Sequence, residues 1–151
     1  MTMLDDNGNE LWKTNHGFVA IDPSPNGRYA IGTDSTVGDG SVSIFNKDGI
    51  VGEVPSDDFF EFDFSMDGSF VAIRVIKLDR TKDYPNPDRE VANLFVMNEF
   101  GKEIWSKKEI AKGDSSSGKV VVLDDNSVEF TTNPLLPESK VYRFDQHGNP
   151  L

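Results

Sequence analysis

A four-residue turn motif, [Asp/Asn]-x-x-Gly, recurs along the chain and restricts what it can fold into. Its clearest copy is Asn98-Glu99-Phe100-Gly101, which one apolar run enters and a second run leaves toward Trp105. Further copies lie at Asp5–Gly8, Asn46–Gly49 and Asp145–Gly148, with spacings of 41, 52 and 47 residues. Glycine accepts the positive φ that a tight reversal between two strands needs. Repetition at this period predicts a repeat protein made of antiparallel strands.

The segments between these turns predict strands in sets of four. A second kind of turn, Asn26-Gly27 and later Asp67-Gly68, divides the first two strands of each set. We expect one repeat domain over 1–151. It consists of one or two leading strands in 1–16, a four-stranded set in 17–58, a second in 59–113 and an incomplete third in 114–151.

The expected fold class is all-β, with antiparallel four-stranded repeats. No segment shows the apolar periodicity of a packed helix, and 106–112 could form one helical turn at most. Residues 112–118 are expected to be a soft linker before the third set. Trp12 and Trp105 occupy equivalent repeat positions, which favours core packing between neighbouring sets over ligand stacking.

Composition restricts the classes of partner. The chain has 26 acidic and 15 basic residues, a net charge of −11, and such a field repels the phosphate backbone of nucleic acids. No cysteine is present, so disulfides and cysteine chemistry are excluded. The longest apolar runs are only a few residues, and the first residues lack the pattern of a secretion signal. We therefore expect no nucleic acid and no membrane as partner. The compartment stays open, with a cytoplasmic location only as the default.

Three hairpins carry a family resemblance. Ser24–Ile31 and Ser65–Ile73 resemble the S-P-D-G hairpin of TolB-like and tryptophan–aspartate-type propeller blades, and Asn93–Trp105 is similar to blades of the pyrroloquinoline-quinone-type propellers. The resemblance covers nearly the whole chain and implies a β-propeller blade, not a function. It brings no catalytic residues, and no residue matches the cofactor-binding positions of the quinone dehydrogenases, so no cofactor is expected.

About three blades are too few to close a ring, which typically takes 4–8. An unclosed arc would leave apolar blade faces that need a partner. Three solutions remain open. Copies of the chain could assemble as a dimer or trimer, for example two chains in a six-bladed ring with Leu11-Trp12 completing the partner's last blade. The chain could be part of a longer propeller. It could also form another β structure, such as an open three-sheet prism or a sandwich.

The candidate site lies on the face that carries the long loops, because variable loops on a rigid sheet are where binding sites usually occur. In a blade this face combines the loops between second and third strands, 35–40, 78–90 and 133–139, with the connections between blades, 13–17, 55–58 and 109–118. The loop acids of 83–90 could approach a hard cation such as calcium, but they lack the spacing of an EF-hand loop, and a solvated loop is the better interpretation. The candidate ligand- or partner-binding residues are Asp34, Asp39, Asp83, Tyr84, Asn86, Asp88 and Glu90.

These observations favour a non-catalytic binding or scaffolding module that recognises a protein or a glycan. A hydrolase with an acidic, metal-assisted site on the same face is the alternative, and it needs two carboxylates in one concavity, within about 5–10 Å. Asp34, Asp39, Asp83 and Asp88 are its best candidates. A third hypothesis is a purely self-assembling half-propeller without a ligand.

Overall fold

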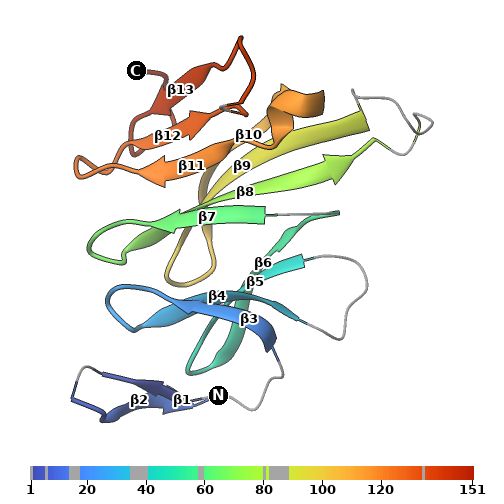
Figure 1. Ribbon diagram of the computed structural model, residues 1–151. Helices are drawn as coiled ribbons and strands as arrows, with labels where there is room; N and C mark the ends of the chain where they lie inside the picture. The colour runs from blue at the N-terminus through green and yellow to red at the C-terminus, as the bar shows by residue number, and fades with distance from the viewer. Residues whose placement is uncertain are drawn as a thin grey trace.

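The computed structural model describes residues 2–5, 7–13, 18–34, 41–57, 60–79, 81, 89–133 and 135–151. The side chains of 18–21, 34 and 114–115 are outside this description. The chain is all-β, and its sheets are stacked one above another in chain order from the N-terminal hairpin to the C-terminal sheet (Figure 1).

In the described residues, the stack contains a hairpin, two four-stranded antiparallel sheets and a three-stranded sheet. The hairpin pairs β1 (Thr2–Leu4) with β2 (Glu10–Lys13). The first four-stranded sheet consists of β3 (Phe18–Pro23), β4 (Tyr29–Asp34), β5 (Ser41–Asn46) and β6 (Gly49–Pro55). The second consists of β7 (Phe60–Phe64), β8 (Phe70–Leu78), β9 (Glu90–Asn98) and β10 (Glu103–Lys112). The last consists of β11 (Lys119–Val122), β12 (Val128–Thr131) and β13 (Val141–Phe144).

The turn motif has a specific hydrogen-bonding role. In the Asp5, Asn98 and Asp145 copies, one side-chain oxygen accepts two backbone N–H groups, from the second and fourth residues further along the chain. Asn46 accepts one, from Asp48, at 2.8 Å. The four motif glycines all have positive φ, between 70° and 112°. The short polar side chain and the glycine therefore define the turn together, which explains their fixed spacing.

Equivalent positions after these turns contact the next sheet. Trp12 pairs with Met3 and donates its indole Nε1–H to the carbonyl of Gly27, at 2.9 Å. Trp105 pairs with Val96 and donates to the carbonyl of Gln146, at 3.2 Å. Both indoles are buried. Each tryptophan thus joins the last strand of one sheet to a turn of the next.

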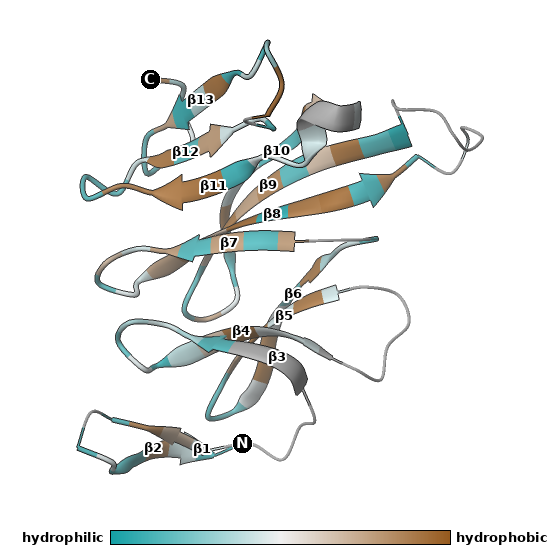
Figure 2. Ribbon diagram, in the orientation of Figure 1, coloured by the Kyte–Doolittle hydropathy of each residue, from teal (hydrophilic) through white to brown (hydrophobic). Residues whose placement is uncertain are grey.

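The core lies between the sheets. One cluster fills the space between the second four-stranded sheet and the C-terminal sheet, and it includes Phe70, Leu94, Trp105, Phe130 and Phe144. Another joins the two four-stranded sheets, and a smaller one holds the hairpin through Met3 and Trp12. Figure 2 shows apolar residues concentrated along β8, β9 and β11. The face-to-face packing of successive sheets is the main source of stability.

For the segment after Trp105, one sequence expectation is confirmed and one is wrong. Residues 106–112 form no helix, as their lack of apolar periodicity indicated, and β10 continues through them to Lys112 with an irregularity at Glu109, whose φ is 53°. The expected soft linker contains a short 3-10 helix, η2 (Gly113–Ser116), and Ser116 is fully buried. The main-chain carbonyl of Ser116 accepts a hydrogen bond from Arg74 Nη1 at 3.3 Å. This hydrogen bond attaches the connection between β10 and β11 to the second four-stranded sheet.

The outward face of the C-terminal sheet is largely polar. Val120, Val128, Phe130 and Phe144 point into the core, so strand alternation places the other side chains outward. The outward residues are Lys119, Val121, Glu129, Thr131, Val141 and Arg143. Arg143 forms an ion pair with Asp125 at 2.6 Å. A polar outer face is typical of the terminal, capping unit of a repeat array.

Candidate functional site

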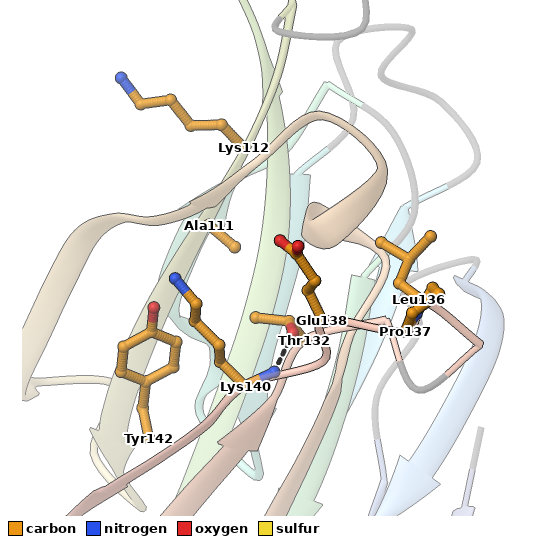
Figure 3. Close-up of a pocket in the computed structure, with 8 residues that line it drawn as sticks. All are labelled: Ala111, Lys112, Thr132, Leu136, Pro137, Glu138, Lys140 and Tyr142. Atoms are coloured by element: carbon orange, nitrogen blue, oxygen red, sulfur yellow. Dashed lines mark hydrogen bonds between the residues drawn. The ribbon is translucent and has the colours of Figure 1, made fainter.

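A pocket of about 530 Å³ opens between the end of β10 and the loop that connects β12 to β13. Ala111 and Lys112 line one side, and Leu136, Pro137 and Glu138 line the other. Thr132, Lys140 and Tyr142 complete the lining (Figure 3). Two of the segments assigned by the repeat pattern to the long-loop face, 109–118 and 133–139, therefore meet around one concavity.

Hydrogen bonds between side chains and the main chain hold the loop in place. The amide of Lys140 donates to Thr132 Oγ1 at 2.7 Å, and Ser139 Oγ donates to the Thr132 carbonyl at 3.0 Å. Thr132 itself is 3% exposed. The loop is thus anchored at its base, and the backbone that carries Glu138 and Lys140 is held in place.

Glu138 lies in the turn before β13, Lys140 directly precedes this strand and Tyr142 belongs to it, and the three side chains point the same way in Figure 3. The ring of Tyr142 stacks on Phe130 with centroids 6.4 Å apart, so a core residue supports it. Lys112 points away from the pocket in Figure 3 and forms an ion pair with Glu109 at 2.8 Å. The pocket combines an aromatic ring, a flexible cation, a carboxylate and an apolar wall of Leu136 and Pro137.

A buried charged group lies elsewhere, between β7, β8 and η2. The Arg74 side chain is 7% exposed, and its Nε is 4.0 Å from Oε2 of Glu61. Within the described part of the chain, neither of these two atoms has a hydrogen-bond partner. Burial lowers the pKa of Arg74, and the negative charge of Glu61 opposes that shift. The nearby Asp63 carboxylate accepts a hydrogen bond from the amide of Val122 at 2.8 Å. This bond links the second four-stranded sheet to the C-terminal sheet.

Most of the sequence-predicted site residues lie outside the described residues. These are Asp39, Asp83, Tyr84, Asn86 and Asp88. The backbone of Asp34 ends β4 and pairs with Phe18, while its side chain is not described. Glu90 begins β9 as an exposed residue, and its Oε2 accepts a hydrogen bond from Ser116 Oγ at 3.1 Å. The structure therefore tests neither their convergence nor the calcium hypothesis. The described residues alone contain no group of three metal-ligating side chains.

The pocket residues were not predicted individually. The sequence indicates the two segments that meet there, because both are connections on the long-loop face. It gives no signal for Lys140 and Tyr142, which have an ordinary strand pattern. Their position beside a concavity depends on the distance between two packed sheets, and a repeat pattern does not indicate that distance.

Fold and site together define a class: an all-β protein of four-stranded, propeller-like blades with a pocket between two of them. Among the described residues, no helix is long and apolar enough to span a membrane. The sequence matches no protein-family model, and no curated protein is similar enough to count as a relative.

The chain is also similar to solved structures, at 15% sequence identity. One is the dihydro-heme d1 dehydrogenase NirN in complex with DHE, a β-propeller protein, with a TM-score of 0.46 over 99% of this chain. Another is a eukaryotic initiation factor, with a TM-score of 0.41 over 97% of this chain. The chain spans 31% and 46% of the lengths of these two proteins. Both TM-scores are below 0.5, so neither likeness supports a conclusion about fold or function.

Proposed function

We propose that the chain is a non-catalytic binding module that recognises a glycan or a protein segment at the pocket beside Tyr142. The observation that supports this proposal is the convergence of the two long-loop-face segments around that pocket. A preformed concavity with an apolar wall and a few polar groups is the usual form of a ligand site.

The chemistry of the lining favours a ligand rich in hydroxyl groups. The Lys140 ammonium donates hydrogen bonds, the Glu138 carboxylate accepts them, and the Tyr142 hydroxyl does both. An aromatic ring offers a flat apolar surface for the C–H face of a sugar. Glu138 and Lys140 balance each other in charge, and Lys112 is paired with Glu109. A neutral glycan fits this balance better than a polyanion does.

The hydrolase alternative needs a second carboxylate in the concavity. Among the described residues that line the pocket, Glu138 is the one acid. This observation supports binding over cleavage at this pocket. The acidic-site hypothesis for Asp34, Asp39, Asp83 and Asp88 stays a prediction. Release of reducing sugar from a bound oligosaccharide would favour that alternative.

The experiment is saturation-transfer-difference NMR with a panel of neutral oligosaccharides and, separately, a panel of short peptides. We expect at least one ligand to bind, and Lys140→Ala or Glu138→Gln to weaken it about tenfold. Lys108→Ala, at an exposed position in β10, is the matched control. Tyr142→Phe keeps the ring on Phe130 and removes only the hydroxyl. Absence of binding in both panels, or equal affinities for the Lys140 and Lys108 variants, would reject the proposal.

A further inference from the structure

Two Asn-Gly steps lie in turns of this chain, Asn7-Gly8 in the N-terminal hairpin and Asn26-Gly27 in the first four-stranded sheet. Asparagine loses ammonia most readily when glycine follows it, because glycine has no Cβ to hinder its own amide nitrogen. That nitrogen attacks the asparagine Cγ. The surrounding structure decides whether the two atoms can meet, and the two turns differ in this respect.

The side chain of Asn26 is held at both ends of its amide group. Its Nδ2 donates to the main-chain carbonyls of Asp67 at 3.1 Å and Gly68 at 2.9 Å, in the next sheet. Its Oδ1 accepts hydrogen bonds from Ser24 Oγ at 2.8 Å and from the Arg28 amide at 3.0 Å. A Cβ at Gly68 would lie 2.7 Å from Asn26 Cγ, so the neighbouring turn covers the carbon that would be attacked. Rotation of this amide toward the next backbone nitrogen would break all four hydrogen bonds.

The side chain of Asn7 lies in the opposite environment. The residue is exposed, and within the described part of the chain no hydrogen bond holds its side-chain amide. A Cβ added at Gly8 would meet no atom within 4 Å, so the space beside the reacting groups is open. The Gly8 amide donates to the Asp5 carbonyl at 2.9 Å, as the Gly27 amide does to Ser24, and this bond must open before the nitrogen can attack. The two steps therefore differ in how the side chain is held, not in the bonding of the attacking amide.

The place of each turn in the stack also affects how easily it opens. The N-terminal hairpin is a pair of short strands at one end of the stack, and two-stranded hairpins are only marginally stable (Figure 1). The Asn26 turn is bonded on one side to Gly68 and on the other to Trp12, whose indole donates to the Gly27 carbonyl. Local opening should therefore require less free energy at Gly8 than at Gly27.

We propose that Asn7 is a site of spontaneous deamidation and isomerisation, and that the fold protects Asn26. The Gly8 nitrogen forms a bond to Asn7 Cγ, the bond from Cγ to Nδ2 breaks, and the amide proton leaves with the ammonia. One water molecule then opens the cyclic imide. Cleavage between the nitrogen and Cγ gives aspartate, whereas cleavage between the nitrogen and the main-chain carbonyl carbon gives isoaspartate. No oxidant or reductant takes part.

Isoaspartate disrupts the turn, whereas aspartate fits it. Asp5 Oδ1 accepts the amides of Asn7 and Asn9 at 2.9 and 2.8 Å, and isoaspartate inserts an extra main-chain carbon between these two amides. Asp48 occupies the equivalent place in another copy of the turn motif, so an ordinary aspartate is compatible with it. Loss of the turn would loosen the strand that carries Trp12.

The test is incubation of the full chain in mildly alkaline buffer, followed by peptide mapping with mass spectrometry. We expect Asn7 to convert at least about tenfold faster than Asn26 in the folded chain, because the hairpin opens more readily. In guanidinium chloride, where the fold protects neither residue, the two rates should agree within about threefold. Asn149 is the negative control, because it precedes a proline, whose nitrogen carries no proton to lose. Asn7→Gln should prevent the reaction at this position, because the larger imide ring closes far more slowly.

The indole N–H signals in NMR test the consequence. In incubated protein we expect a changed signal for Trp12 and an unchanged one for Trp105, which donates to Gln146 at another sheet junction. Asn7→Asp should leave both signals in place. The proposal is overturned if Asn7 converts no faster than Asn26 in the folded chain, or if their difference persists in guanidinium chloride. It is also overturned if chains that carry isoaspartate keep the original Trp12 signal. None of these outcomes bears on the oligosaccharide and peptide panels, so this proposal and the proposed function can fail separately.

Discussion

Gly52 lies against Gly101 so closely that a Cβ at Gly52 would be 2.5 Å from the Gly101 carbonyl oxygen. Gly52 of β6 pairs with Ile44 of β5, and Trp105 of β10 pairs with Val96 of β9. Gly52 and Trp105 therefore occupy equivalent positions in their sheets. Two junctions of the stack therefore use a tryptophan at this position. At the third, its absence allows the Asn98–Gly101 turn to reach the backbone of the preceding sheet.

This contact predicts a large effect of Gly101→Ala. Alanine would have to adopt φ of 70° and overlap the Val51 backbone, and the two penalties together should reduce the free energy of unfolding by about 3 kcal/mol. Gly8→Ala is the control, because Gly8 has φ of 80° in the equivalent turn and an added Cβ there meets no atom within 4 Å. It should cost only about 1 kcal/mol, for the conformation alone. Urea denaturation measures both, and equal losses would contradict the close packing.

The sheet order was predictable because it depends on local signals. The [Asp/Asn]-x-x-Gly motif specifies a turn by its own hydrogen bonds, and alternating side chains specify the strands beside it. The equivalence of Trp12 and Trp105 was also visible, since both follow the motif glycine by four residues. Gly52 was not recognised as the third member, because its register depends on an irregularity between Ile44 and Phe45. No local pattern encodes such a shift.

The site was less predictable than the fold. Loop position indicated the two segments that meet at the pocket, 109–118 and 133–139, yet the candidate residues chosen from the long loops fall mostly outside the described residues. The buried position of Ser116 shows the difficulty. A Gly/Ser-rich stretch resembles a linker in sequence, but here it accepts a hydrogen bond from Arg74 across the space between two sheets.

Arg74 should be replaceable by an apolar side chain of similar length. A buried guanidinium loses hydration, and Glu61, whose side chain is 43% exposed, lies at 4.0 Å and offers only partial compensation. We expect Arg74→Met to change the free energy of unfolding by less than about 1 kcal/mol. Arg74→Ala should cost about 3 kcal/mol because it leaves a cavity. Chemical denaturation of both variants tests this, and an equally large loss for methionine would show that the charge itself is needed.

The turn aspartates make stability depend on pH. Hydrogen bonds from Asn149 hold the pKa of Asp145 below its usual value of 3.8, and those from Ser127 do the same for Asp125, with Arg143 contributing. A folded-state pKa below the unfolded one adds stability above pH 3.8, which is lost as the pH falls through the folded value. We expect the urea midpoint to be higher at pH 6 than at pH 3. Asp145→Asn should reduce this difference. Asp124→Asn is the control, because it removes an exposed charge next to Asp125.

The homo-oligomer predicted from the number of blades remains to be measured, and the outward face of the C-terminal sheet gives it a specific test. A copy docked on this face would bury Lys119, Glu129 and the Arg143–Asp125 pair, and buried charges lose more hydration than such contacts return. We therefore expect Val141→Asp, on the edge strand β13 of this face, where Val141 is 59% exposed, to leave the mass measured by light scattering unchanged. A dimer or trimer that Val141→Asp dissociates would contradict this reasoning. An assembly that resists Val141→Asp but is dissociated by Leu4→Asp would instead locate the contact at the N-terminal hairpin.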